Sequence, residues 1–206
     1  MRLDIMSSES TKTRTRILDS AWTLLESGSG NAVRMSDIAK AAGISRQAVY
    51  LHFPNRADLL IAVTRHIDDV KDVDTRLAPS RAAKDGETRL DAFVGAWCSY
   101  IPEIFGVASA LISMQDKDEE ARAAWANREQ AVRDGCAAAV SALSRDGNLT
   151  ARLTPKQATD ILWTLLSVQN WAQLTRDCGW SQATYLKHMK DMARQILLPR
   201  GNQAKS

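Results

Sequence analysis

Four side chains rich in hydrogen-bonding groups lie within seven positions of one another: Arg46, Gln47, Tyr50 and His52. Arginine can bind guanine O6 and N7 through two hydrogen bonds, and glutamine can bind adenine N6 and N7 in the same way. Tyrosine and histidine can donate to phosphate oxygens. The group therefore predicts a surface that recognises nucleic acid, with Arg46 and Gln47 at bases and Tyr50 and His52 at the backbone.

The elements that must position these side chains are short helices. Ser45 is a preferred N-cap residue and predicts a helix that runs to about His52. The segment Ala42-Gly43-Ile44-Ser45 is a tight turn that joins this helix to another short one before it. Two short helices joined in this way form a helix-turn-helix, whose second member can lie in the major groove of DNA. Val49 is expected to face inward, which leaves the polar side chains for DNA.

A further helix is predicted directly after this pair. Pro54 cannot continue the preceding helix, and Asn55 with Asp58 resembles a capping box for the next one. Arg56 lies in its first turn, beside free backbone N–H groups, and is predicted to contact a phosphate. An apolar side that includes Leu59 and Val63 indicates that this helix links the first part of the chain to the rest.

The distribution of charge agrees with a polyanionic partner for the first third of the chain. The formal net charge is +3; residues 1–66 contain nine Lys/Arg and six Asp/Glu, and residues 67–206 contain eighteen of each. The whole excess therefore lies around the predicted helix-turn-helix. The first ten residues lack the apolar run of a signal peptide, and no membrane span is expected.

The patterns that announce an enzyme are missing from the sequence. Its three histidines (His52, His66 and His188) are not paired with Cys or Glu at metal-ligand spacing. It contains no nucleophile elbow, phosphate loop or dinucleotide fingerprint. The three cysteines match no metal pattern and are interpreted as reduced, packed thiols in a cytoplasm. We expect no catalytic site, metal or cofactor, and an enzyme remains a remote alternative.

Helical periodicity runs through the remaining sequence, and strand signals are almost absent. Residues 77–86 are interpreted as a connector, followed by a helix from about Glu87 that meets Pro102, where a short helix is expected to begin. Long helices are predicted for residues 118–145, 155–178 and 182–198, the second one opened by Thr154 as its cap. The fold class is therefore all-α, with about nine helices.

The run from Ile17 through Val63 resembles the DNA-binding domain of the tetracycline-repressor (TetR) family of bacterial transcription regulators. The resemblance is carried by five segments in order: Ile17-Leu18-Asp19-Ser20-Ala21, Asp37-Ile38-Ala39, Ala42-Gly43-Ile44-Ser45, Tyr50-Leu51-His52-Phe53 and Leu59-Leu60. It implies a helix-turn-helix domain over residues 11–57 and an effector-binding and dimerisation domain over 58–200. Flexible tails are expected at residues 1–10 and 201–206. One departure is Arg34, where the family usually has a capping threonine; either Ser36 contributes to the cap or the cap is lost, and Arg34 is expected to reach a phosphate.

The resemblance implies a cytoplasmic homodimer that binds double-stranded operator DNA, most simply a repressor released by a small molecule. An effector-independent regulator and an activator remain alternatives. The predicted DNA-binding residues are Arg34, Ser36, Ser45, Arg46, Gln47, Tyr50, His52 and Arg56.

Two sets of apolar residues in the larger domain fit these expectations. Aromatic and thioether side chains line pockets for apolar ligands, although ordinary cores use them too. The predicted pocket residues are Trp97, Tyr100, Ile101, Phe105, Met114, Trp125, Trp163 and Trp171. Apolar stripes on the last two long helices predict a four-helix dimer interface. Its predicted residues are Leu165, Val168, Ala172, Tyr185, Met189, Met192 and Ile196.

Overall fold

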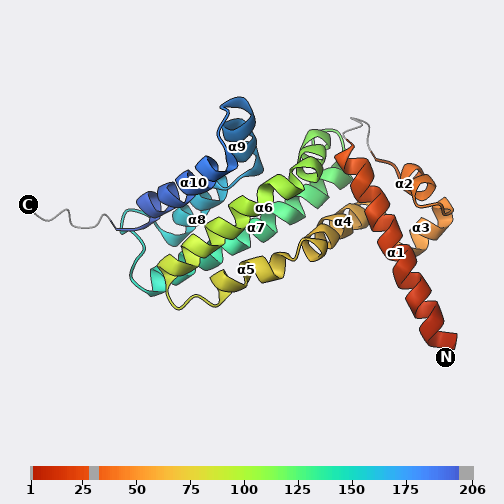
Figure 1. Cartoon of the computed structure of the whole chain (residues 1–206), viewed down its shortest axis with the longest axis horizontal. Helices are drawn as coiled ribbons and strands as arrows, with labels where there is room; N and C mark the ends of the chain where they lie inside the picture. The colour runs from red at the N-terminus through yellow and green to blue at the C-terminus, as the bar shows by residue number, and fades with distance from the viewer. Residues whose placement is uncertain (1, 28–32, 200–206) are drawn as a thin grey trace, which may run out of the picture. The chain divides into compact units, whose positions relative to one another are not determined.

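The computed structural model of the chain describes residues 2–27 and 33–199, with side chains from residue 9 onward, and this part is α-helical without strands. The expectation of an all-α fold is therefore confirmed. In chain order (Figure 1) the elements are α1 (Arg2–Glu26), α2 (Met35–Ala41), α3 (Arg46–His52), α4 (Arg56–Val70), α5 (Val73–Arg81), α6 (Gly86–Met114), α7 (Glu119–Arg145), α8 (Pro155–Leu165), α9 (Val168–Ala172), the π-helical turn η1 (Gln173–Asp177) and α10 (Gln182–Leu197).

These helices form two compact units whose boundary differs from the predicted one. The first unit contains residues 1–71 and 104–128, and the second contains residues 72–103 and 129–206. The second half of α6 and the start of α7 therefore belong with the helix-turn-helix rather than with a separate domain over residues 58–200. Contacts between segments far apart in the sequence decide this division, and periodicity cannot reveal them.

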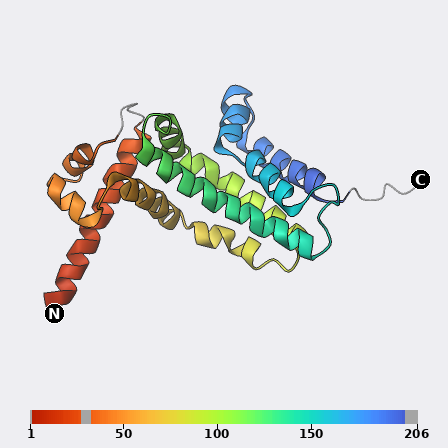
Figure 2. The same cartoon turned by 180° about the vertical axis from the view of Figure 1, so that it is seen from behind.

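The core of the first unit lies where α1 packs against α2 and α4. Ile17, Ala21 and Leu25 recur at four-residue spacing on α1 and are buried, which places one continuous apolar stripe on these neighbours. From α4, Leu59 and Val63 complete this core and have no exposed surface. Figure 2 shows α2 and α3 on one side of α1. The core thus supports two short helices that cannot hold themselves together in water.

The amino-terminal helix is longer than predicted. Residues 2–10 belong to α1 instead of forming a flexible tail. Extending an existing helix adds one hydrogen bond per ordered residue and avoids the cost of a new nucleus. The predicted tail at residues 201–206 lies outside the described residues.

Two glycines allow α6 and α7 to approach closely in the second unit. A Cβ atom on Gly86 would come within 2.5 Å of the backbone nitrogen of Leu143. A Cβ atom on Gly135 would come within 2.5 Å of the Cε2 atom of Phe93. The side chain of Asp146 also accepts a hydrogen bond of 2.6 Å from the Gly86 amide. The start of α6 is thereby attached to the end of α7.

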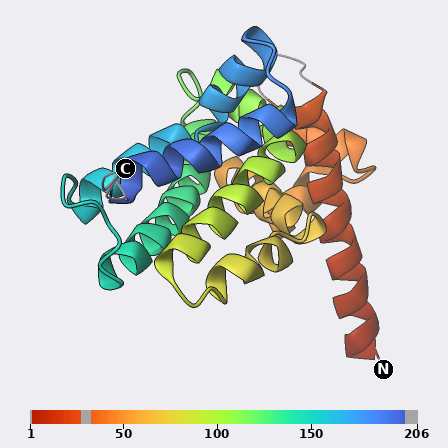
Figure 3. The same ribbon diagram turned by 60° about the vertical axis from the view of Figure 1, so that its left-hand side comes forward.

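The final helices of the second unit begin at well-formed caps. Thr154 accepts a hydrogen bond of 3.2 Å from the Gln157 amide, and its own amide donates to Gln157 Oε1 at 3.0 Å, so α8 begins with the predicted capping box. Ser181 caps α10 by accepting from the Thr184 amide at 3.1 Å. The helices α8 and α10 lie side by side (Figure 3), as their contacts require.

Three predicted segments are wrong. The first part of the connector expected over residues 77–86 is helical instead, since α5 runs to Arg81 with Pro79 inside it. Pro102 lies inside the single helix α6 instead of starting a new one, because buried Ile101 and Ile104 hold the backbone on both sides of the exposed proline. The helix predicted for residues 155–178 is divided into α8, α9 and η1, since Ser167 caps a new helix by accepting from the Asn170 amide at 3.2 Å.

No membrane-spanning segment was expected from the sequence. By length and composition alone, however, α6 is long and apolar enough to cross a membrane. Its residues Val94, Ile101 and Leu111 have no exposed surface within the fold. Such burial along the helix is typical of a core helix, and a core helix passes the same test of length and composition.

Candidate nucleic-acid interface

The helix α3 is held in place by its caps and by one buried side chain. Ser45 Oγ accepts a hydrogen bond of 3.1 Å from the Ala48 amide, as predicted for the N-cap residue. Val49 is the buried residue of α3 and has no exposed surface, and Phe53 follows the helix with 2% of its surface exposed. These anchors leave the other side of this seven-residue helix without protein contacts that would cover it.

The outermost face of α3 consists of Gln47 and Leu51. Each lies two residues from Val49, which places it roughly 200° around the helix from the buried side. Gln47 is exposed, and Leu51 has 83% of its surface exposed. Gln47 was predicted to face DNA. Leu51 was not among the predicted site residues, although the same helical spacing from an inward Val49 identifies it.

Arg46 and Tyr50 lie on one flank of α3 and interact with each other. Arg46 Nη2 donates a hydrogen bond of 3.2 Å to the Tyr50 hydroxyl, and the guanidinium lies 5.5 Å from the centre of the tyrosine ring. Both side chains are exposed. Adjacent residues of a helix project about 100° apart, so Arg46, next to Tyr50, and Gln47 point to different sides of α3 despite being neighbours in sequence.

The flank of α3 opens into a polar pocket of about 530 Å³ that α2 also lines. Three of its residues are arginines, and half of the others carry side-chain hydrogen-bond donors, so a DNA phosphate has several possible partners there. The residues that line this arginine pocket are Arg34, Met35, Ser36, Arg46, Tyr50, Pro54, Asn55, Arg56 and Glu120.

The side chain of Arg34 does not cap α2. A guanidinium has no acceptor atom, so it cannot receive a hydrogen bond from an amide of the first turn. The hydrogen bond at this end of α2 runs the other way: the backbone amide of Arg34 donates to the side chain of Asp37, at 3.3 Å from Oδ2. The threonine-type cap is therefore lost, which is one of the two alternatives that the sequence left open, and the guanidinium of Arg34 is exposed.

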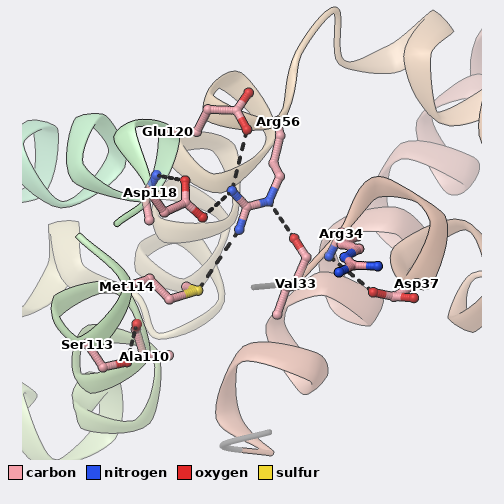
Figure 4. Close-up of polar contacts among 10 residues, drawn as sticks. Val33, Arg34, Asp37, Arg56, Ala110, Ser113, Met114, Asp118 and Glu120 are labelled. Atoms are coloured by element: carbon pink, nitrogen blue, oxygen red, sulfur yellow. Dashed lines mark hydrogen bonds and ion pairs between the residues drawn. The ribbon is translucent and has the colours of Figure 1, made fainter. Parts of the chain in front are cut away.

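The surroundings of Arg56 do not fit its predicted contact with a DNA phosphate. Only 9% of its surface is exposed, and its guanidinium binds protein groups: Nη1 lies 2.7 Å from Asp118 Oδ2 and 3.4 Å from Glu120 Oε2, while Nε donates to the Val33 carbonyl (Figure 4). The Met114 sulfur lies 4.0 Å from Nη2. These partners contradict the assignment of Arg56 to a DNA phosphate. We call this group the Arg56 cluster.

Sequence reasoning missed the Arg56 cluster because its acidic members lie about sixty residues further along the chain. The cluster lies within the first unit and joins the start of α4 to the segment between α6 and α7. A second ion pair, between Asp68 and Arg128, joins the other end of α4 to α7. Helix α4 is thus attached at both ends to the part of α6 and α7 in its own unit.

His52 lies away from the arginine pocket. It is half-buried and lines a second pocket of about 680 Å³ between α1 and α4. The guanidinium of Arg14 lies in the same pocket, 4.7 Å from the centre of the Phe53 ring. His52 is therefore separated from Tyr50 by the turn of the helix, and its predicted phosphate contact stays a prediction.

The residues predicted to line an effector pocket are divided between the units. Phe105, Met114 and Trp125 belong to the first unit, and the others belong to the second. Trp97 and Trp171 have partners for their indole nitrogens: Trp97 Nε1 donates to the Leu166 carbonyl at 2.8 Å, and Trp171 Nε1 donates to Gln182 Oε1 at 2.9 Å. The buried members are Trp97, Tyr100, Ile101, Trp125 and Trp171, and the half-buried ones are Phe105, Met114 and Trp163.

The predicted dimer residues also fall into two groups. Val168, Tyr185 and Met189 have at most 3% of their surface exposed, so they belong to the core of the protomer and cannot form an exposed stripe. Leu165, Ala172, Met192 and Ile196 are half-buried and keep apolar surface at the edge of this core. The sequence pattern identified the apolar side of each helix and did not separate its centre from its edge.

Comparison with known proteins supports the interpretation of this surface. Residues 17–63 match the family model for bacterial regulatory proteins of the tetR family. The transcriptional repressor LfrR of Mycolicibacterium smegmatis is 41% identical over 66 residues, which is 32% of this chain and about a third (34%) of the relative. The transcriptional regulator UidR of Escherichia coli is 22% identical over 187 residues, which is 87% of this chain and 93% of UidR.

Solved structures have the same fold along nearly the whole chain. A TetR-family regulator from Rhodococcus sp. superposes with a TM-score of 0.72 at 19% identity, covering 91% of this chain and 99% of its own. A transcriptional regulator from Saccharomonospora viridis in complex with choline has a TM-score of 0.71 at 21% identity, covering 92% and 100%. Together with the capped α2–α3 pair, these findings show that residues 17–63 are a DNA-binding domain of the tetR type, and that the chain resembles bacterial transcriptional regulators of this family rather than enzymes.

Proposed function

We propose that the protein is a cytoplasmic repressor that binds a palindromic operator as a homodimer and leaves it when a small, mostly apolar effector binds. The observation that carries the proposal is α3, a capped helix whose polar side is exposed and whose one buried residue anchors it to the core. A helix of this kind is suited to enter the major groove, because its scaffold holds the backbone while the outward side chains meet the bases.

The directions of the side chains on α3 assign different roles to them. Gln47 projects from the outermost face and binds the edge of a base, for which adenine is the usual partner of glutamine. Arg34, Arg46 and Tyr50 surround the arginine pocket and bind a phosphate of the same groove. Phosphate contacts fix the position of the helix, and base contacts supply the sequence preference.

Dimerisation supplies the second half of the recognition. One short helix reads a few base pairs, and two helices reading a palindrome multiply the discrimination. The half-buried side chains Leu165 of α8 and Met192 and Ile196 of α10 offer apolar surface on neighbouring helices of the second unit. Pairing of these helices with their twofold copies gives a four-helix interface.

Effector release acts through α4. The Arg56 cluster and the Asp68–Arg128 pair attach both ends of α4 to the parts of α6 and α7 in the first unit. An effector that displaces these parts therefore moves α4, which is separated from α3 by only three residues. Because the two recognition helices must lie about 34–36 Å apart on DNA, a small change in α4 weakens binding. A coupling free energy of about 1–3 kcal/mol is typical of such regulation.

The test is selection of the preferred operator from random DNA, followed by a screen for small molecules that release it. A palindromic sequence bound by two protomers supports the proposal. Reciprocity requires that operator DNA weaken effector binding by the factor by which the effector weakens DNA binding. Equal effector affinities with and without operator contradict effector release and leave a constitutive regulator. Increased transcription from the bound promoter contradicts repression and identifies an activator.

A further inference from the structure

Leu51 is the most exposed large apolar side chain of the described residues. It has 83% of its surface exposed, compared with 55% for Val70 and 39% for Tyr50. Single exposed leucines on an ordinary surface need no explanation. Leu51 is different because it lies on the outermost face of α3, one helical turn after Gln47 and directly opposite the buried Val49.

The chemistry of the major groove specifies what an apolar side chain can meet there. Base edges in that groove present hydrogen-bond donors and acceptors, with one apolar exception, the C5-methyl group of thymine. A leucine opposite a polar base edge leaves the donors and acceptors of that edge without partners, and this is unfavourable. A leucine against a methyl group removes apolar surface of both from water.

We propose that Leu51 reads a thymine in each operator half-site by contact with its C5-methyl group. This assignment rests on the proposed binding of α3 in the major groove and adds a specificity-determining residue to it. Gln47 and Leu51 are four residues apart, a separation of about 6 Å along the helix axis. Successive base pairs are separated by about 3.4 Å, so the thymine lies within about two base pairs of the base bound by Gln47.

The surroundings of Leu51 favour DNA over a protein partner. The other exposed side chains of this helix are Arg46, Gln47 and Tyr50, which carry hydrogen-bond donors. A protein–protein interface needs a contiguous apolar centre, and one leucine among donors does not supply it. The net positive charge of residues 1–66 also suits a phosphate-rich partner.

Replacement of thymine by deoxyuridine tests the proposal, because it removes the methyl group and leaves the pairing edge unchanged. The operator selected by the wild-type protein is synthesised with each thymine replaced in turn, symmetrically in both half-sites. One methyl is equivalent to about 0.8 kcal/mol of burial, or about fourfold in affinity, so we expect roughly tenfold or more for the two half-sites together. The dissociation constant is measured by fluorescence anisotropy at fixed salt.

The variant Leu51→Ala completes a double-mutant cycle. It should bind the thymine operator several-fold more weakly than the wild type and lose its sensitivity to deoxyuridine at the one position. The variant Val70→Ala is the matched control, since it shortens an exposed apolar side chain outside α3. It should keep the wild-type response at every position. Circular dichroism of both variants confirms that α3 and its scaffold remain folded.

Three outcomes overturn the assignment of Leu51. They are a selected operator in which no thymine responds to deoxyuridine, an equal response in wild type and Leu51→Ala, and a change of oligomeric state in Leu51→Ala, which would show that another protein chain covers the leucine. Failure of the wild-type protein to select any sequence would instead overturn the proposed DNA-binding function. The two failures are therefore distinguishable.

Discussion

Neighbouring residues on α3 have different surroundings, and this difference separates readers of sequence from contacts that only position the helix. Gln47 is free to meet a base edge, whereas Arg46 is bound to Tyr50 beside the arginine pocket. The sequence alone placed Arg46 and Gln47 together as base readers. We propose a base for Gln47 and a phosphate for Arg46, because helical geometry turns adjacent side chains about 100° apart.

We predict that Gln47→Ala costs about 1–3 kcal/mol of binding free energy and relaxes the preference at one base pair of each half-site. Arg34→Ala should weaken binding to all sequences alike and lower the magnitude of the salt slope by about one unit for each phosphate that the arginine neutralises. Titrations with specific and random DNA at several salt concentrations measure both effects. Lys84→Ala is the control, since it removes one exposed positive charge in the second unit. A specific effect of Arg34→Ala on one base pair would contradict the phosphate assignment.

The three cysteines should differ sharply in reactivity. Burial raises the pKa of the Cys98 and Cys136 thiols from 9.0 to about 12, so at pH 8 both remain protonated and inaccessible. Cys178 is exposed, contrary to the expectation that all three thiols are packed. Ellman's reagent should therefore detect one fast thiol per chain, and Cys178→Ser should remove that phase. Fast reaction of two thiols in the native protein would contradict the burial.

The same pKa shifts predict how stability changes with alkaline pH. Folded-state pKa values above the unfolded value of 9.0 mean that the unfolded chain releases its thiol protons first. The stabilising contribution is complete below about pH 9 and decreases as pH rises toward 12. Urea titrations between pH 8 and pH 10.5 should show a steeper loss of unfolding free energy than the double variant Cys98→Ala, Cys136→Ala.

At the scale of elements, the Arg56 cluster determines how firmly α4 is attached to the segment between α6 and α7. We predict that Asp118→Ala lowers the free energy of unfolding by about 1–3 kcal/mol, since the nearly buried guanidinium keeps Glu120 and the Val33 carbonyl but no longer has its nearest carboxylate partner. Urea denaturation measures the change. Asp116→Ala, which removes an exposed carboxylate nearby, should change stability by less than about 0.5 kcal/mol.

The elements also show what the sequence can and cannot predict. The caps at Ser45, Thr154 and Ser181 were correctly predicted, because a cap depends on residues three positions apart. The path of α6 through Pro102 was not, because packing on either side decides whether a helix survives a proline. The partners of Arg56 were also missed, since a contact across about sixty residues leaves no periodic signal.

At the scale of the whole molecule, the proposed dimer depends on apolar surface that one protomer leaves half-covered. Leu165→Glu would place an unpaired carboxylate in the interface, and burial of such a charge is unfavourable by several kcal/mol. Sedimentation velocity at micromolar concentration should show a monomer, with operator affinity reduced accordingly. Ala131→Glu, which adds the same charge at an exposed position of α7, should remain dimeric. A dimeric Leu165→Glu would place the interface on other helices.

The close approach of α6 and α7 limits which substitutions the gene can tolerate at two glycine codons. Any residue larger than glycine at position 86 meets the backbone of Leu143, and at position 135 it meets the ring of Phe93. Overpacking of this kind usually destabilises a protein by about 1–3 kcal/mol, and a backbone obstacle yields less than a side chain does. A mutational scan that selects for the proposed operator binding should therefore return destabilised variants at these two codons, which are distant in sequence from every residue proposed to touch DNA. Selection should therefore remove substitutions of both glycines, and it should tolerate fewer residue types at position 86 than at position 135.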